Sequence, residues 1–172
     1  VRHVGSFAGR SLTEVEVVGN RGTSGIDGCV STAWGAALGF QSLGGGPSVA
    51  LLGDEAFWYD SNALAVPADE LRPDLVIVVA DNDGAGIFST LEQGEPAYSR
   101  HFERVFGVPM GVQIASLATS FGASVCEVND ADELAPAVQR ADQGVPGGRE
   151  ARRPRRGAQE VGDAPELELP CD

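Results

Sequence analysis

The chain has 172 residues, 42% of them hydrophobic, which is room for one folded core with a tail. A formal net charge of −13 argues against a surface for binding nucleic acid or an anionic membrane. All twelve basic residues are arginines, and the lack of lysine excludes a P-loop lysine, a pyridoxal Schiff base and a lysine nucleophile.

The first predicted elements surround a glycine-containing loop. Residues 15–18, Val-Glu-Val-Val, predict a short strand. Residues 21–28 contain three glycines and lead into a predicted helix over 28–43, whose apolar residues recur at helical spacing. Asp27 stands at the position of an N-cap. A loop of this kind offers free backbone N–H groups to an anion or a cofactor, although the signal is weak by itself.

The centre of the chain predicts a strand–helix–strand unit. Apolar runs at 48–52 and 75–79 are typical of strands in a parallel sheet. Residues 56–66 are long enough for one crossover helix, which Pro67 ends. Because such a crossover makes the two strands parallel, we expect Asp54 and Asn82 side by side at the carboxyl edge of the sheet, where α/β proteins bind ligands.

These two strand ends offer oxygen ligands to a divalent cation. Asp54 supplies a carboxylate, Asn82 an amide oxygen, and the backbone near Gly84 a carbonyl. A hard divalent ion that takes its remaining ligands from phosphate groups suits this set. The glycines at 53, 84 and 86 permit close approach of a phosphate to the backbone. The alternative is that Asp54 caps the next helix and that Asn82 begins an ordinary turn.

The later elements complete a predicted α/β three-layer sandwich with a mainly parallel sheet. We expect the segment up to residue 111 to cover the mouth of the site, with His101 solvated rather than acting as an acid or base. A helix is predicted over 114–121, a strand over 124–128, and a helix from 130 with acids at its positive end. The sheet would then have at least four strands. Residues 1–141 form the predicted domain, and 142–172 a low-complexity tail that we expect to be disordered.

Two motifs resemble known proteins. Gly53-Asp54, followed after a crossover by Asn82, is similar to the thiamine-diphosphate motif of the decarboxylase and acetolactate-synthase superfamily. The loop Asn20-Arg-Gly-Thr-Ser-Gly-Ile-Asp-Gly28 closely resembles the NRGxSGIDG signature of the 2-succinyl-5-enolpyruvyl-6-hydroxy-3-cyclohexene-1-carboxylate (SEPHCHC) synthases, the MenD family of menaquinone biosynthesis. The likeness continues through Ile87-Phe88 and Leu91-Glu-Gln-Gly94 and spans residues 1–135.

The resemblance implies the thiamine-diphosphate-binding fold and a set of site residues. The implied ligands of Mg²⁺ or Mn²⁺ are Asp54, Asn82 and Gly84. The implied contacts with thiamine diphosphate, apart from the metal ligands, come from Gly25, Ile26, Gly53, Glu55 and Ala56. The implied substrate contacts come from Ser6, Arg10, Arg21, Ile87, Phe88 and Leu91. Two alternatives stay open: a solvated turn for Ser6 and Arg10, and a place in the core, on the next helix, for the apolar residues 87, 88 and 91.

Three departures from the family pattern weaken the expected cofactor binding. Glu55 stands where the family has an apolar residue and places a negative charge near the diphosphate. Ala56 stands where a hydroxyl can occur, and Asp83 and Ala85 alter the usual Asn- and Gly-rich turn. A bound Mg²⁺ would offset part of the added charge.

The implied activity is that of a transferase. It decarboxylates 2-oxoglutarate on thiamine diphosphate and adds the product to isochorismate. In the family, the activating glutamate lies on a separate pyrimidine-binding domain that a partner subunit presents, so we expect no catalytic residue in this chain, a homo-oligomer for the full enzyme, and no activity of the chain alone. The alternatives are the cofactor domain of another thiamine-diphosphate decarboxylase or acetolactate-synthase-like enzyme, and a non-catalytic relic fragment.

The remaining expectations concern the compartment and the extent of the chain. Cys29, Cys126 and Cys171 form no CxxC pair, so we expect buried thiols in a cytoplasmic protein. No run approaches the roughly 20 apolar residues of a membrane span. The chain starts at Val1 and its one methionine is Met110, so we expect a fragment of a longer protein.

Overall fold

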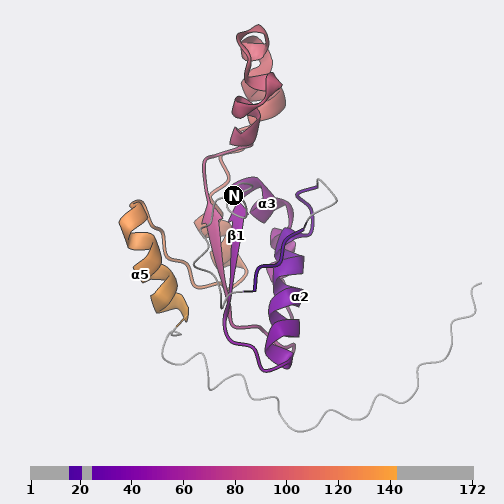
Figure 1. The fold of residues 1–172 in the computed structure, drawn as a ribbon, viewed down its shortest axis with the longest axis vertical. Coiled ribbons are helices and arrows are strands. Elements are labelled where there is room, and N and C mark those ends of the chain that lie inside the picture. Colours follow the sequence, from indigo (N-terminus) through magenta and orange to yellow (C-terminus); the bar gives the residue numbers. More distant parts are fainter. Residues whose placement is uncertain (1–15, 21–24, 143–172) are drawn as a thin grey trace, which may run out of the picture.

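The computed structural model describes residues 16–20 and 25–142, which form an α/β arrangement (Figure 1). The α-helices and strands are α2 (Cys29–Ser42), β1 (Ser48–Gly53), α3 (Asp54–Tyr59), β2 (Leu75–Ala80), α4 (Ile114–Ser120) and α5 (Ala131–Asp142). The short 3₁₀ or π turns are η1 (Ser61–Leu64), η2 (Gly86–Thr90), η3 (Glu92–Gly94), η4 (Pro96–His101) and η5 (Glu103–Gly107). In these described ranges no helix is long and apolar enough to cross a membrane.

The central unit is the predicted strand–helix–strand. Strands β1 and β2 pair in parallel, in register from Ser48 opposite Leu75 to Gly53 opposite Ala80. The prediction of one crossover helix over 56–66 is wrong. Instead α3 begins at Asp54 and ends at Tyr59, and η1 follows. The break falls at Asp60, whose backbone (φ −121°, ψ 21°) leaves the helical region.

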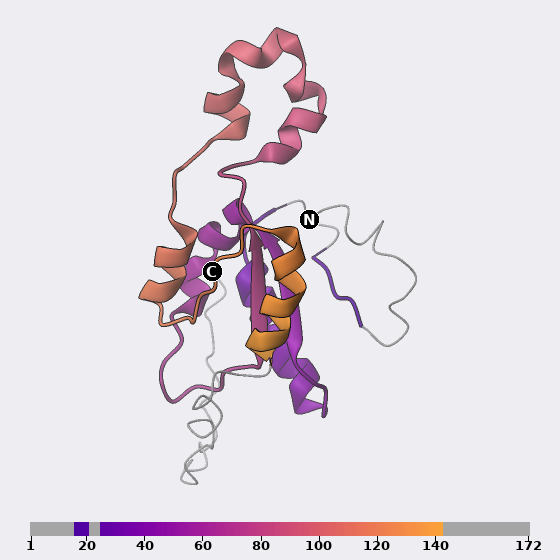
Figure 2. The same cartoon turned by 90° about the vertical axis from the view of Figure 1, so that its left-hand side faces the viewer.

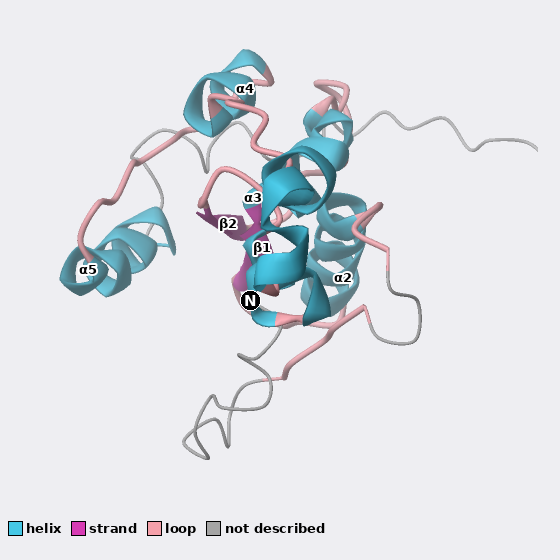
Figure 3. Cartoon of the chain, turned by 90° about the horizontal axis from the view of Figure 1, so that it is seen from above, coloured by secondary structure: helices cyan, strands magenta, loops and turns pink. Residues whose placement is uncertain are grey.

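The hydrophobic core lies on one face of this strand pair. Its buried members are Val30, Phe57, Leu64 and Ala118, contributed by α2, α3, η1 and α4. Side chains from the facing side of the sheet, including Leu52 and Ile77, pack against them. Helix α5 lies on the other side of the sheet, beside β2 (Figures 1 and 3).

The opposite face of β1 is left largely open. Val49 is 58% exposed and Leu51 37% exposed. Because α2 and α5 flank the sheet on two sides, the α/β class is confirmed, whereas the three-layer sandwich remains a prediction.

Two predicted strands are wrong in the described part of the chain. Residues 16–18 and residues 124–128 form neither a strand nor a helix. The structure there contains one sheet of two strands rather than at least four. A β-branched sequence favours extended backbone, but a strand also needs a partner. Val125 is 44% exposed, so this segment gains little from burial. Cys126 next to it is also exposed and Cys29 is only half-buried, so the prediction of buried thiols is wrong for Cys126.

The helices after the sheet agree with the prediction. Helix α4 covers all but the last residue of the predicted 114–121, and α5 begins one residue after Asp130 with acids in its first turn. The predicted tail from 142 falls almost wholly outside the described residues, so the domain boundary stays a prediction.

Residues 86–107 form an arm that extends beyond the carboxyl end of the sheet (Figures 1 and 2). Its turns η2 to η5 pack mainly on one another. The ring of Phe106 lies 5.7 Å from that of Phe88 and 6.2 Å from that of Phe102, measured between centroids. These rings give the arm a small apolar centre of its own, separate from the core.

Candidate functional site

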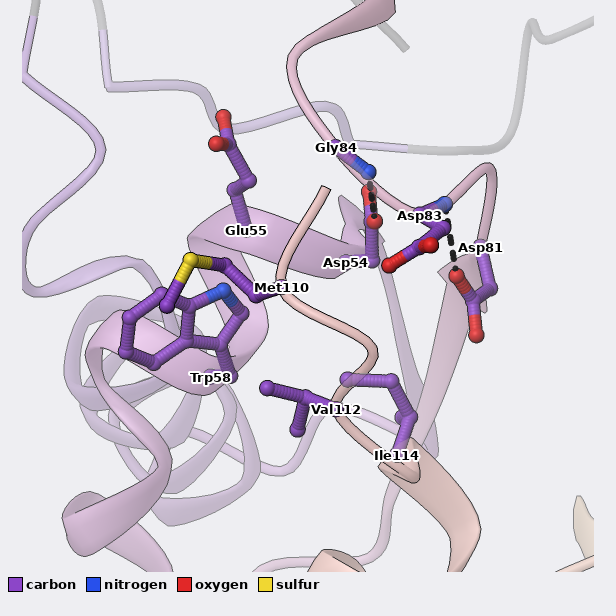
Figure 4. Close-up of a pocket in the computed structure, with 9 residues that line it drawn as sticks. All are labelled: Asp54, Glu55, Trp58, Asp81, Asp83, Gly84, Met110, Val112 and Ile114. Carbon is purple, nitrogen blue, oxygen red and sulfur yellow. Dashed lines mark hydrogen bonds between the residues drawn. The ribbon is translucent and has the colours of Figure 1, made fainter. Parts of the chain in front are cut away.

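The candidate site begins where the two strands end. Gly53 and Ala80 are the last paired residues, so Asp54 and the loop 81–85 leave the sheet at the same edge. The carboxylate of Asp54, only 6% exposed, accepts a hydrogen bond at 2.7 Å from the backbone N–H of Gly84 to Oδ2 (Figure 4). The side chain at the end of β1 therefore holds the loop that follows β2.

The loop itself is tightly turned. Asp83 and Gly84 have positive φ values of 52° and 138°, and the backbone N–H of Asp83 donates to Oδ1 of Asp81 at 3.0 Å. The backbone N–H of Ala85 donates to the carbonyl of Gly107 at 2.9 Å. A Cβ on Gly84 would collide with that same Gly107 carbonyl, so only glycine fits there.

A small cavity of about 10 Å³ lies against this loop, room for roughly one water molecule or one ion. Four of its lining residues carry carboxylates, and four are apolar or aromatic (Figure 4). With Gly84 the lining set is Asp54, Glu55, Trp58, Asp81, Asp83, Met110, Val112 and Ile114. Its size suits a metal ion, and any larger cofactor would extend outside it.

The electrostatics of the cavity favour a cation. None of the lining residues carries a positive charge. The pKa of Glu55 is raised, first by burial and second by the neighbouring charge of Asp54. Figure 4 shows the Glu55 carboxylate directed away from the three aspartates. A divalent cation beside Asp54 would offset the excess negative charge.

The donor set fits an ion that is shared with another ligand. In the part of the chain that the structure describes, no group of three or more His, Cys, Asp or Glu side chains is placed to hold a metal ion. Asp54 Oδ2 is already bonded to Gly84, which leaves Oδ1 to face an ion. An ion held by one carboxylate would need backbone, amide or phosphate oxygens to complete its shell, as Mg²⁺ commonly does.

The structure brings Asp54 and Gly84 together but places the side chain of Asn82 elsewhere. Asn82 is exposed and does not line the cavity. Its amide nitrogen lies against Gly86, where a Cβ would approach it to 2.6 Å. Asn82 is thus at the predicted edge of the sheet, and its role as a metal ligand stays a prediction.

The start of α2 differs from the prediction. The N-cap is Gly28 in the left-handed conformation (φ 71°), so the predicted N-cap role of Asp27 is wrong. The backbone N–H of Ser31 in the first turn donates to the carboxylate of Asp60. Gly25 is exposed and Ile26 half-buried just before this turn. The amino end of α2 therefore already has a carboxylate partner from within the chain.

The other predicted site residues fall in three places. Glu55 and Ala56 lie in α3 and are half-buried, directly after Gly53. Ile87 and Phe88 are half-buried in η2 of the arm, whereas Leu91 is 44% exposed. Ser6, Arg10 and Arg21 lie outside the described residues.

Sequence reasoning missed five residues that line the cavity, namely Trp58, Asp81, Met110, Val112 and Ile114. Asp81 stands inside the recognised motif and could have been found there. Trp58 follows Asp54 by one helical turn, and this spacing also could have predicted that the two lie on the same face of a helix. The other three follow the arm, and they reach the cavity only because the chain returns to the sheet edge after residue 107.

Comparisons with known proteins agree with the motifs. Residues 9–147 match the family model described as thiamine pyrophosphate enzyme, C-terminal TPP binding domain. The similar proteins are named 2-succinyl-5-enolpyruvyl-6-hydroxy-3-cyclohexene-1-carboxylate synthase. One from Saccharopolyspora erythraea is 48% identical over 135 residues, which are 78% of this chain and 24% of that protein.

Two further relatives carry the same name. The Thermobifida fusca protein is 52% identical over 125 residues, 72% of this chain and 22% of its own length. The Rhodococcus erythropolis protein is 46% identical over 132 residues, 76% of this chain and 24% of its own. The chain thus spans about a quarter of the length of the curated relatives it matches, and the predicted family resemblance is confirmed. With a family model matched over most of its length, the chain belongs to the thiamine pyrophosphate enzymes, as a C-terminal TPP binding domain.

Proposed function

We propose that this chain is the cofactor-binding part of a SEPHCHC synthase, a transferase that decarboxylates 2-oxoglutarate and adds the product to isochorismate. The observation that carries the proposal is the bond between Asp54 and the backbone of Gly84. It unites the two halves of the thiamine-diphosphate motif at one edge of a parallel sheet, the edge where α/β proteins bind ligands.

In this proposal the sheet edge holds Mg²⁺ or Mn²⁺. Oδ1 of Asp54, the amide oxygen of Asn82 and the carbonyl of Gly84 would be the protein ligands, and the diphosphate would supply the others. Asn82 would have to turn its side chain from Gly86 toward the cavity. Thiamine diphosphate, when bound, supplies the electron sink for the decarboxylation.

The remaining roles concern binding and orientation. Gly25, Ile26, Gly53, Glu55 and Ala56 would contact the cofactor. The side chains proposed to bind substrate acid groups are Ser6, Arg10 and Arg21, since guanidinium groups match carboxylates in geometry. Ile87, Phe88 and Leu91 in the arm would exclude water over the reacting carbon.

The rest of the site would come from elsewhere in the assembled enzyme. We propose that the activating glutamate lies on a pyrimidine-binding domain, presented by a partner subunit in a homo-oligomer. Within residues 16–20 and 25–142, β1 and β2 pair with no third strand, and one face of β1 is exposed. Both observations support a larger sheet in the complete domain, with the three-layer arrangement predicted from the sequence. The chain alone would then bind cofactor without forming product.

Calorimetric titration of the 172-residue chain with thiamine diphosphate and Mg²⁺ tests this proposal. We expect saturable binding that Asp54→Ala weakens at least about tenfold, because the metal loses its carboxylate and Gly84 its acceptor. Asp54→Asn keeps an acceptor for Gly84 and loses the charge, so it separates the two effects. Asp69→Ala, an exposed aspartate after η1, is the matched control.

Two results would contradict the proposal. One is no binding by the wild-type chain at millimolar cofactor and Mg²⁺, which would favour a relic fragment. The other is equal affinity in the wild type and Asp54→Ala, which would place the cofactor elsewhere.

A further inference from the structure

Three consecutive residues at the sheet edge are held by two other segments of the chain. Oδ1 of Asp83 accepts a hydrogen bond from the backbone N–H of Gly111 at 2.8 Å. The N–H of Gly84 donates to Asp54 at 2.7 Å. The N–H of Ala85 donates to the carbonyl of Gly107 at 2.9 Å. Asp54 of α3 therefore holds the backbone of Gly84. The last residue of the arm, Gly107, and Gly111 just after it hold the two neighbours of Gly84.

Of the two bonds to Gly107 and Gly111, the one made by Asp83 depends on a side chain. Ala85 and Gly107 bond through their backbones, so that contact survives substitution. One carboxylate oxygen of Asp83 links it to Gly111, which follows 28 residues later in the sequence. Its left-handed backbone (φ 52°) and the bond of its N–H to Asp81 set the direction of this side chain.

We infer that Asp83 is a positioning residue that fixes the base of the 86–107 arm to the strand-end loop and thereby holds Gly84 in place for the metal. The second half of the inference, that Asp83 holds Gly84 in place for the metal, rests on the proposed function, in which Gly84 is the carbonyl ligand. Its first half, the attachment of the arm, depends only on the described contacts. Asp83 acts through Gly84 and Gly111 and is not assigned contact with the cofactor.

The residue type suits this task for two physical reasons. Asp and Asn tolerate the left-handed region better than other side-chain-bearing residues, because their short polar groups bond locally. Both also present a Oδ1 acceptor to Gly111. Asp83→Asn should therefore keep the contact, Asp83→Gly should keep the backbone but lose the acceptor, and Asp83→Ala should lose the acceptor and strain the backbone.

Amide hydrogen exchange of the full chain, followed by NMR, tests the first half without cofactor. We expect the Gly111 amide to exchange about tenfold faster in Asp83→Gly and Asp83→Ala than in the wild type, since one hydrogen bond is lost. Asp83→Asn should restore slow exchange, and Asp69→Ala should behave as the wild type. If Asp83→Ala does not fold, Asp83→Gly still gives the comparison. Equal Gly111 exchange in the wild type and Asp83→Gly would overturn the inference.

Titration of the same variants with thiamine diphosphate and Mg²⁺ tests the second half. We expect Asp83→Gly to bind several-fold more weakly and Asp83→Asn to recover wild-type affinity, a rescue that a purely charge-based role would not show. Faster Gly111 exchange with unchanged affinity would overturn the positioning role. Absence of binding by the wild type would instead contradict the proposed function, and the exchange data would still decide whether Asp83 holds the arm.

Discussion

The carboxylate of Asp60 lies 2.7 Å from the backbone nitrogen of Ser31, although 29 residues separate them in sequence. Its second oxygen accepts from the Ser31 hydroxyl at 3.1 Å. Asp60 is only 8% exposed and sits between α3 and η1, so it satisfies a free N–H in the first turn of α2 from another element. The same residue that ends α3 thus stabilises the start of α2.

Asp60→Ala should lower the free energy of unfolding by about 0.5–2 kcal/mol, because two partly buried donors on Ser31 lose their acceptor. Urea denaturation of the chain measures this. Asp27→Ala is the control: Asp27 precedes the same helix but makes no cap bond, and its effect should stay within about 0.5 kcal/mol. A larger loss for Asp27 than for Asp60 would refute the assignment of the cap.

Gly84→Ala should destabilise the strand-end loop, since the new Cβ would collide with the Gly107 carbonyl at a φ of 138°. We expect a loss of at least about 1–3 kcal/mol and faster proteolysis of the 86–107 arm. Gly35→Ala is the matched glycine variant. Gly35 lies inside α2 with open space around its Cβ position, so alanine should stabilise the chain by about 0.5–1 kcal/mol. Equal effects at the two positions would argue against the packed loop.

Glu55→Gln should raise thermal stability at neutral pH. Burial and the charge of Asp54 raise the pKa of Glu55 above its usual value of 4.5 in the folded chain. A carboxyl whose folded pKa is raised stabilises fully below its unfolded pKa and loses that contribution as pH rises through the folded pKa. The wild type should therefore lose stability as pH rises above 4.5 relative to Glu55→Gln. Melting curves of both proteins from pH 4 to 7 check this, and parallel curves would contradict it.

Phe57→Ala and Phe106→Ala should separate the core from the arm. Phe57 is 2% exposed in the core, and its truncation should cost about 3–5 kcal/mol of global stability. Phe106 packs with two other rings of the arm, so its truncation should speed proteolytic cleavage within 86–107 and change the melting temperature of the core little. A melting temperature that falls as far for Phe106→Ala as for Phe57→Ala would show that arm and core unfold together.

The elements that were predicted correctly are those determined by residues close together in the sequence. Helix α2 follows from apolar residues at helical spacing, α5 from the acids at its start, and the parallel pairing of β1 and β2 from two apolar runs joined by a crossover. The wrong predictions include the single crossover helix over 56–66, the Asp27 N-cap and the strands at 15–18 and 124–128. The strands show the reason most clearly. Their residues favour extended backbone, but pairing depends on what lies beside them.

The family, and the meeting of Asp54 with the loop after β2, could be inferred from the amino-acid residues alone, because motif residues at the ends of successive parallel strands must share one edge. Three contacts became visible only in the folded chain: Asp60 rather than Asp27 caps α2, Asn82 lies beside Gly86, and Asp83 binds Gly111. Some of these contacts join residues that are far apart in the sequence. In the others, a side chain takes one of several orientations of similar energy. These contacts depend on how the chain returns after a crossover or an arm, which no local pattern of residues encodes.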